Sequence, residues 1–447
     1  MVGIGPFITI PLFIKAMGGP HALVAWPIAA VLVLCDGLVW SELGAAMPGS
    51  GGTYHFLREI FGRYRWGRLL PFLFIWQFLV TGTMEMASGY IGAIPYVQYI
   101  FDPSQVKPPD GDATAETPDD AATPAPGPQI SWTARAIAAG CSIIIAVALC
   151  RRIQFVGWFG VVLCGGTMLT VLGVIAAGLT HFDASLLTFP PNAFALNASF
   201  AFGLASAMRI AVYDYLGYYN VCHLGDEVRE PGRTIPRAVI VSVLIIAATY
   251  LTMNLSIIAV VPWQRAMNST VVASDFMERL FGRPFAVAFT WLILWTVAAC
   301  MFAITLGYSR IPYAAARNGD FFSVFAKVHA RDRFPTVALA AISALTAFFC
   351  FFSLDLVVNS AVTIRIAVQF IGQIVALHVV RTTRPDVKLP FRMWLYPVPS
   401  LLALVGWLFV LFMPDPDLAW RPLLLALGVN LSGCVAFVLW HSATRTT

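Results

Sequence analysis

Long apolar runs with almost no charge set the strongest limit on what this chain can fold into. Three of them are LLPFLFIWQFLV at 69–80, AVIVSVLIIAATYLTMNLSIIAVV at 238–261 and FAVAFTWLILWTVAACMFAITLGY at 285–308. A helix needs about 20 apolar residues to cross the hydrocarbon core of a bilayer. Of the 447 residues, 59% are hydrophobic and 11% are charged, whereas ordinary soluble domains carry about 25% charged residues. The sequence therefore predicts an all-α, polytopic membrane protein.

Twelve membrane-spanning helices can be placed along the chain from its apolar segments. The predicted spans cover residues 1–17, 21–46, 69–100, 132–150, 156–180, 193–222, 237–261, 284–309, 335–353, 356–380, 396–413 and 421–440. An even number of spans puts both termini on the same side of the membrane. We expect the lipid bilayer to surround the outer surface of this helical bundle.

Lysine and arginine are distributed unevenly over the connections between these spans. The connections on the side of the termini hold 19 of the 28 basic residues, those on the opposite side hold seven, and Arg209 and Arg365 lie within spans. Cytoplasmic loops of membrane proteins are enriched in Lys and Arg. We therefore expect a multi-pass protein of the cell (plasma) membrane with both termini in the cytoplasm.

The motifs give no support to several other classes of function. The eight cysteines include no C-x-x-C pair and no cluster with metal-ligand spacing, and the seven histidines are scattered. Neither H-E-x-x-H nor G-x-S-x-G occurs in the sequence. We therefore expect no enzyme activity, no metal site and no cofactor. The net charge of +5 reflects the basic loops on one side, so no nucleic-acid partner is expected.

Two connections have compositions that set them apart. The outer connection at 102–129 holds seven prolines and six acidic residues, a composition that predicts a disordered acidic loop. The cytoplasmic stretch at 309–335 alternates small, aromatic and basic residues. This pattern predicts a helix that lies at the membrane surface.

The first and sixth predicted spans are interrupted by residues that break helices. The first carries Gly3, Gly5, Pro6 and Pro11, and the sixth carries the stretch AVYDYLGYYN at 211–220. In a bilayer, irregular backbone is tolerated only where it is buried in protein or lines a cavity. Opened helix ends offer N–H groups to an anion and C=O groups to a cation. Two broken helices five spans apart are typical of inverted-repeat transporters with a site at the membrane midplane.

Five blocks of the sequence together resemble the amino acid–polyamine–organocation (APC) permeases. GIGPF at 3–7 resembles the unwound first-helix signature G-x-G-x-F of that family. The other blocks are SELGAAMPGSGGTYHFLREIFG at 41–62, GDEVREPGRTIPRAV at 225–239, SRIPYAAARNGDFFSVFAKVHARDRFP at 309–335 and RTTRPDVKLPFRMWLYPVP at 381–399. They occur in the family order. Within the family, the GIGPF block favours the polyamine-transporter and L-type amino acid transporter branch.

The resemblance implies a LeuT-like fold, which is a five-plus-five inverted repeat followed by two further helices. The first repeat would occupy residues 1–180, the second 193–380, and the last two helices 396–440. Only two residues precede Gly3. We therefore expect the first helix to be truncated at its inner half.

The same resemblance implies a secondary transporter that moves amino acids or polyamines by alternating access, through proton-coupled symport or exchange. The unwound backbone that would hold the amino or carboxylate end of the substrate consists of Gly3, Ile4, Gly5 and Pro6. On the opposing broken helix the candidates are Tyr213, at the position of the family's aromatic gate, Asp214, Tyr215 and Gly217.

Two acidic residues inside spans are candidates for binding an ammonium group or carrying a coupling proton. Asp214 lies in the interrupted sixth span and Glu85 in the third. A carboxyl inside the membrane is costly and therefore points to function or to an internal partner. The alternative for both is a structural salt bridge with Arg209 or Arg365.

Four further residues are candidates for coupling or gating. Asp36 fits either a contact with substrate or a buried packing role, and Glu42 fits an inner gate or a structural charge. Thr167 offers a sodium ligand, although hydroxyls in membrane helices often bond their own backbone. Arg209 would reach Asp214 if the helix between them unwinds. The coupling ion is therefore a proton or, through Thr167, sodium.

Two alternatives to an amino acid or polyamine carrier stay open at this point. One is an ion channel, which would need a continuous pore with a selectivity ring, and no filter-like repeat stands out in the sequence. The other is a carrier for another organic cation. Saturable counterflow would separate a carrier from a channel.

Overall fold

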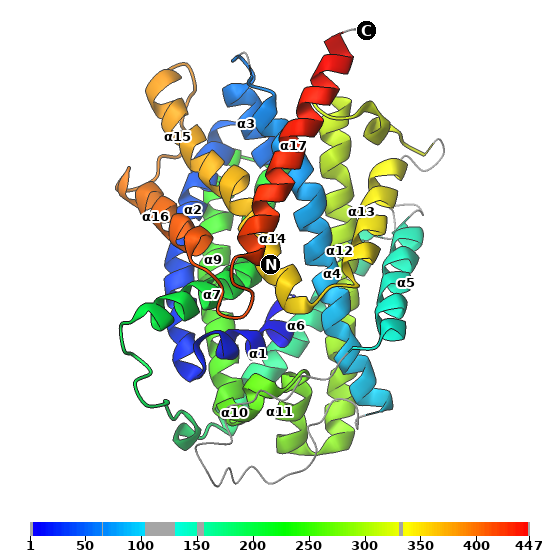
Figure 1. Ribbon diagram of the computed structural model, residues 1–447, viewed down its shortest axis with the longest axis vertical. Coiled ribbons are helices and arrows are strands. Elements are labelled where there is room, and N and C mark those ends of the chain that lie inside the picture. Colours follow the sequence, from blue (N-terminus) through cyan, green and yellow to red (C-terminus); the bar gives the residue numbers. More distant parts are fainter. Residues whose placement is uncertain (1–2, 65, 103–129, 150–155, 330–333, 446–447) are drawn as a thin grey trace.

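The chain is described by a computed structural model, which covers residues 3–64, 66–102, 130–149, 156–329 and 334–445. Within these residues every regular element is a helix, apart from isolated β-bridges (Figure 1). The α-helices are α1 (Gly5–Met17), α2 (Ala25–Ala46), α3 (Thr53–Phe61), α4 (Leu69–Phe101), α5 (Trp132–Leu149), α6 (Val156–Thr180), α7 (Ala198–Tyr215), α8 (Asn220–His223), α9 (Pro231–Ile258), α10 (Trp263–Asn268), α11 (Val272–Phe281), α12 (Arg283–Arg317), α13 (Thr336–Phe349), α14 (Leu354–Arg365), α15 (Gly372–Thr383), α16 (Val398–Phe412) and α17 (Arg421–Arg445).

Eight helical segments of the described residues are long and apolar enough to cross a membrane. They are Pro20–Ala46, Leu69–Phe101, Trp132–Leu149, Gly160–Thr180, Pro231–Ile258, Arg283–Arg317, Leu354–Thr383 and Arg421–Ala443. Three shorter apolar helices, α1, α13 and α16, occupy further predicted spans. The prediction of a polytopic, all-helical membrane protein is thus confirmed, whereas the count of twelve spans stays a prediction.

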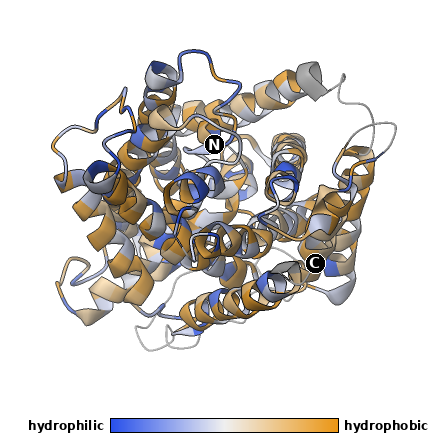
Figure 2. Cartoon of the chain, turned by 90° about the horizontal axis from the view of Figure 1, so that it is seen from above, coloured by the Kyte–Doolittle hydropathy of each residue, from blue (hydrophilic) through white to orange (hydrophobic). Residues whose placement is uncertain are grey.

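Burial separates the central helices from those that face outward. In the most apolar 18-residue stretch of α4, 78% of the residues are buried, and the share is the same in the segment Leu354–Thr383. The corresponding share is only 22% in α17 and 28% in α5. Seen from above, the peripheral helices carry much of the hydrophobic colour (Figure 2). An apolar outer face suits hydrocarbon, where no water is present to solvate polar groups. The bundle is therefore built around α4 and α14.

Helix packing brings the ends of distant segments together. α1 packs against α7, α2 against α9, and α4 against both α12 and α14. The helices α3 and α15 lie at one end of the molecule together with the C-terminus, and α10 and α11 lie at the opposite end (Figure 1). The predicted spans did not include α3, α10 and α11, which are short helices within the connections.

The interruption predicted in the sixth span is present in the fold, whereas α1 is a continuous helix in which Gly5 and Pro6 are helical rather than unwound and Pro11 causes no break. Residues 3–4 form a bend and α1 begins at Gly5, with Pro6 in its first turn, where a missing N–H removes no helical hydrogen bond. α7 ends at Tyr215, and the chain passes through Gly217, with a φ of 102°, before the short α8 begins. That φ lies in a region that glycine adopts readily and other residues avoid.

Another interruption was not predicted. The tenth predicted span consists of α14, a π-helical stretch at Ile366–Ile371 and α15. Residues 356–371 contain neither glycine nor proline, and Gly372 stands only at the end of the stretch, so the local sequence does not mark where the change begins. π-helical turns inside α-helices are frequent at functional sites. This one follows directly after Arg365.

The structure also corrects the prediction of a surface helix over residues 309–335. α12 continues as far as Arg317, and the following turn contains Gly319 with a φ of 75°. The N–H of Asp320 donates to the carbonyl of Ala315 across this turn, as in a glycine-terminated helix end. The remainder includes a short 3₁₀ turn at Ser323–Ala326. The predicted disordered loop at 102–129 falls, apart from Asp102, outside the described residues.

Glu42 anchors α2 to the chain around α15. Its carboxylate is fully buried and pairs with Arg381, with both nitrogen–oxygen distances at 2.7 Å. The backbone N–H of Met393 donates to the same carboxylate at 2.8 Å. Arg381 also lies over the ring of Tyr396, 3.8 Å from the centroid. This ion pair fits both alternatives predicted for Glu42, an inner gate and a structural charge.

Replacing Glu42 with Gln is expected to destabilise the fold, because it leaves the Arg381 guanidinium without its counter-charge. Breaking a buried ion pair from one side costs about 3–5 kcal/mol of the free energy of unfolding. The measurement is the apparent Tm of the purified protein in detergent. Asp386→Asn is the matched control, since it removes an exposed partner of Arg384 and should change the Tm little. Equal Tm values for the two variants would contradict a structural role for Glu42.

Candidate substrate cavity

A cavity of about 1130 Å³ lies where α1 and α7 meet. α1, α4, α6, α7, α9 and α12 all contribute to its wall. Eight of the predicted site residues line it: Gly3, Ile4, Gly5, Glu85, Thr167, Tyr213, Asp214 and Gly217. The structure thus brings together residues from four different helices that are up to about 210 positions apart in the sequence.

The first turn of α1 and the last turn of α7 are in direct contact. A Cβ atom added at Gly5 would lie 2.2 Å from Oδ1 of Asp214, so only glycine allows this approach. The hydroxyl of Thr9 donates to Oδ2 of Asp214 at 2.6 Å and also lies 3.0 Å from the carbonyl oxygen of Gly5. The start of α1 and the end of α7 are therefore joined through one carboxylate.

The second oxygen of Asp214 is unsatisfied. Asp214 is only 4% exposed, and its Oδ1 has no hydrogen-bond partner among the described residues. A buried carboxylate oxygen without a donor is costly, and a bound cation or proton would relieve this cost. Asp214 is thus suited to hold an ammonium group or a proton.

Tyr250 of α9 supports the chain before α1. The backbone N–H of Gly3 donates to its hydroxyl oxygen at 3.2 Å, and Tyr250 also lines the cavity. The first N–H groups of a helix lack partners within the helix and carry the positive end of its dipole. The N-terminus of α1 therefore presents a partial positive charge to the cavity.

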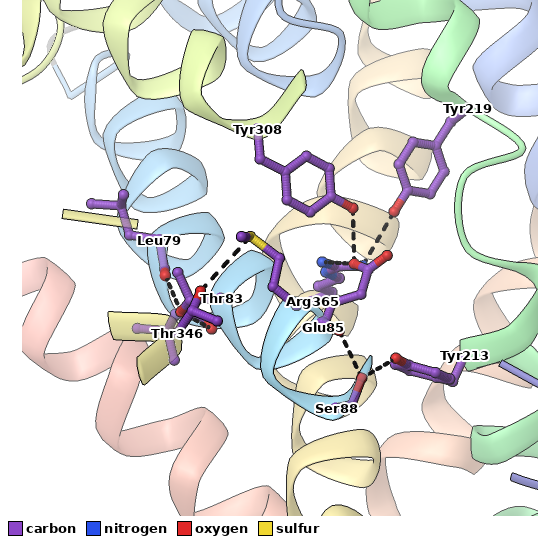
Figure 3. Close-up of polar contacts among 11 residues, drawn as sticks. Leu79, Thr83, Glu85, Ser88, Tyr213, Tyr219, Tyr308, Thr346 and Arg365 are labelled. Carbon is purple, nitrogen blue, oxygen red and sulfur yellow. Dashed lines mark hydrogen bonds and ion pairs between the residues drawn. The ribbon is translucent and has the colours of Figure 1, made fainter. Parts of the chain in front are cut away.

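Glu85 of α4 takes part in a second polar network on the cavity wall (Figure 3). Its Oε2 accepts a hydrogen bond from Arg365 at 2.6 Å and another from the hydroxyl of Tyr308 at 2.9 Å. Arg365 also donates to the hydroxyl of Tyr219 at 3.4 Å. The salt bridge with Arg365, one of the two alternatives for Glu85, is therefore formed. One turn along α4, the hydroxyl of Ser88 is bonded to that of Tyr213.

Thr167 contributes a hydroxyl to the cavity wall from α6. The hydroxyl donates to the backbone carbonyl of Leu163 at 3.1 Å, as Ser and Thr in membrane helices commonly do. Its oxygen keeps the capacity to accept a bond or to contact a cation. The backbone alternative for Thr167 is thus present, and sodium coordination stays a prediction.

Asp36 lies away from the cavity in a fully satisfied packing site. Its carboxylate is fully buried and accepts bonds from Trp40 at 2.9 Å, Tyr218 at 2.5 Å and Trp407 at 3.0 Å. These donors come from α2, from the link after α7 and from α16. The packing alternative therefore fits Asp36 better than contact with substrate.

Arg209, Tyr215 and Pro6 also lie outside the cavity wall. Arg209 donates to the carbonyl of Met413 at 3.0 Å, in the link between α16 and α17, and does not approach Asp214. The two residues are five positions apart on the continuous helix α7, so they do not share a face. Tyr215 is buried against Trp26, with ring centroids 5.5 Å apart.

Three residues that the sequence analysis did not single out help to form the site. Thr9 stands four residues after Gly5, on the same face of α1, which is a signal that the sequence contains. Tyr308 and Tyr250 come from α12 and α9 and reach the site only through tertiary packing. No local pattern distinguishes them from other tyrosines in apolar helices.

Comparison with known proteins decides the family. A family model described as amino acid permease matches residues 1–432. The chain belongs to the amino acid permease family. The match confirms the resemblance to the APC superfamily, and it makes the chain a multi-pass membrane transporter rather than an enzyme.

The relatives of this permease are amino acid transporters. It is 26% identical over 438 residues to Asc-type amino acid transporter 1 of Mus musculus, and the alignment covers 93% of this chain and 74% of that relative. It is 25% identical over 456 residues to the cystine/glutamate transporter of Homo sapiens, and the alignment covers 100% of this chain and 84% of that relative. Large neutral amino acids transporter small subunit 2 of Mus musculus is 24% identical over 429 residues, and the alignment covers 92% of this chain and 73% of that relative.

The contact between Gly5 and Asp214 predicts a sharp effect of Gly5→Ala on transport by this permease. The added methyl group would meet Oδ1 at 2.2 Å, so either the Asp214 carboxylate or the two helices must shift. Overpacking of this kind costs about 1–3 kcal/mol. At 1.4 kcal/mol per factor of ten, uptake into proteoliposomes should fall by about five- to a hundredfold. Gly165→Ala on α6 is the control, because no atom lies within 4 Å of its added Cβ. Wild-type uptake by Gly5→Ala would show that this approach of the helices is dispensable.

Proposed function

We propose that this permease is a secondary active transporter that moves amino acids across the cell membrane by alternating access. The observation that carries the proposal is the junction of α1 and α7 at the cavity. The N-terminus of α1 offers partial positive charge to a carboxylate, and the carbonyl groups at the end of α7 together with Asp214 suit an ammonium group. A zwitterionic α-amino acid carries both groups on one carbon.

The balance of charge at the cavity wall supports an ammonium or proton partner for Asp214. Glu85 is paired with Arg365, so these two charges compensate each other. Asp214 is contacted by the neutral hydroxyl of Thr9 and by no ion-pair partner among the described residues. One negative charge on this side of the cavity therefore stays uncompensated until a cation or a proton arrives.

The coupling mechanism we propose is proton symport or exchange, with Asp214 as the residue that takes up the proton. Alternating access within a five-plus-five inverted repeat would then carry the loaded site from one side to the other. The cavity wall includes loop residues Ser50, Gly51 and Asp226, which the basic-residue asymmetry places on the cytoplasmic side. Sodium coupling through Thr167 is the alternative.

Polyamine transport is a second candidate function, favoured by one observation. The unpartnered oxygen of Asp214 would hold the primary ammonium of a polyamine as readily as that of an amino acid. The N-terminus of α1, however, offers nothing to a molecule without a carboxylate. The named relatives are amino acid transporters, which also favours amino acids over polyamines or another organic cation.

Uptake by Asp214→Asn tests this assignment. Purified wild type and variant are reconstituted into liposomes, and uptake of radiolabelled neutral amino acids, lysine and putrescine is followed with and without an inward proton gradient. If Asp214 carries the proton, the variant should lose stimulation by the gradient and keep counterflow exchange. If Asp214 binds the ammonium group, both should fall by about tenfold or more.

Controls separate this result from instability and from a channel. Asp417→Asn removes an exposed partner of Lys15 far from the cavity and should transport like wild type. Saturable counterflow by the wild type is expected of a carrier, whereas ohmic conduction would indicate a channel. Full gradient-driven uptake by Asp214→Asn would contradict both roles of the carboxylate. A gradient of sodium alone that drives uptake would favour the Thr167 alternative.

Labelling from outside intact cells tests the proposed orientation in the membrane. Lys388, in the connection after α15, lies on the predicted cytoplasmic side, and Asp417, in the connection before α17, lies on the outer side. A membrane-impermeant thiol reagent should label Asp417→Cys above the level of the parent protein and should leave Lys388→Cys at that level. After the membrane is permeabilised, both variants should react. The opposite pattern would invert the proposed orientation and place the termini outside.

A further inference from the structure

In the ion pair of Glu85 and Arg365, the carboxylate lies between the cavity and the guanidinium. Glu85 lines the cavity and its side chain is 11% exposed, whereas Arg365 is 1% exposed and is not part of the wall. Figure 3 shows the guanidinium beside the carboxylate, with Tyr308 and Tyr219 around them. A substrate side chain that points toward α4 therefore meets Glu85 before it meets Arg365.

Arg365 depends on Glu85 for its counter-charge. Within the described part of the chain, Glu85 is the acidic residue in ion-pair contact with it, at 2.6 Å. Its contact with Tyr219 is long at 3.4 Å, and its Nε has no hydrogen-bond partner there. A guanidinium this deeply buried requires an anion, because an unpaired buried charge is strongly unfavourable.

Glu85 holds Arg365 through one carboxylate oxygen, and the same oxygen accepts the hydroxyl of Tyr308. The geometry therefore keeps the guanidinium turned toward α4 and away from the cavity. An acidic substrate side chain in this region would approach a carboxylate first and would be repelled. A neutral side chain would meet a pair whose charges cancel.

We propose that Glu85 sets the charge specificity of the cavity. Because it keeps Arg365 paired and out of contact with substrate, amino acids with a side-chain carboxylate are excluded. This inference rests on the proposed amino acid transport and names the substrate class: neutral and basic amino acids are accepted, and glutamate and aspartate are rejected. Without the Glu85 carboxylate, Arg365 becomes a binding site for a carboxylate of the substrate, which can form two parallel hydrogen bonds with a guanidinium.

The experiment compares Glu85→Gln with wild type in proteoliposomes. Uptake of radiolabelled leucine, lysine and glutamate is measured, together with the inhibition of leucine uptake by unlabelled glutamate. The ratio of glutamate to leucine uptake should rise by about tenfold or more in Glu85→Gln, since a buried charge then lacks its partner. Glutamate should become an inhibitor of leucine uptake in the same variant.

Two further variants test whether the effect acts through Arg365. The double variant Glu85→Gln/Arg365→Gln should lose the gain in glutamate uptake, and Glu85→Asp, which keeps the negative charge, should keep the exclusion. An unchanged glutamate-to-leucine ratio in Glu85→Gln, or an equal gain in the double variant, would overturn the proposal.

Separate readouts distinguish this inference from the proposed function and from misfolding. Leucine and lysine uptake by the wild type reports on amino acid transport itself, whereas the change in the glutamate-to-leucine ratio reports on Glu85. If Glu85→Gln cannot be purified as a monodisperse protein, the Arg365→Gln variant is measured instead. That variant leaves Glu85 unpaired, so lysine uptake should rise relative to leucine uptake by about tenfold or more. A ratio equal to that of wild type would then overturn the proposal.

Discussion

The approach of Asp214 to Gly5 is the contact on which the rest of the site depends. Broken helix ends within a membrane must find partners for their backbone groups inside the protein. Here the Asp214 carboxylate at the end of α7 accepts a hydrogen bond from the Thr9 side chain of α1, and the absence of a side chain at Gly5 allows that carboxylate to come close. The Thr9 hydroxyl then binds one oxygen, and the other, which lies against Gly5, has no hydrogen-bond partner among the described residues. A larger residue at position 5 would displace the Asp214 carboxylate or the helices from this arrangement.

The buried acids of this permease differ in how many hydrogen bonds their carboxylates accept. Within the described residues, Glu42 and Asp36 each accept hydrogen bonds from three donor groups. Asp214 accepts one from Thr9 and keeps an oxygen without a partner. A fully bonded carboxylate gains nothing from a new ligand, whereas an unsatisfied one does. The number of donors around each acid therefore identifies Asp214 as the residue that still requires a partner.

The sequence predicted the features that arise from local composition. Apolar runs located the helices, and glycine located the break after α7, because this residue acts on the backbone at its own position. The π-helical stretch after Arg365 and the donors around Asp36 were not predictable in this way. Trp407 lies 371 residues from Asp36 in the sequence, so only tertiary packing brings them together.

Two buried ion pairs link helices that are distant in the sequence. Arg381 ties α15 to α2 through Glu42, and Arg365 ties α14 to α4 through Glu85. Separating either pair would leave charges buried without partners, so these contacts resist separation of the helices that they join. α1 and α7 are joined at the cavity by the single neutral donor of Thr9, among the side-chain contacts described for Asp214. In the proposed alternating-access cycle, a proton or an ammonium group on Asp214 would act directly on this contact between α1 and α7.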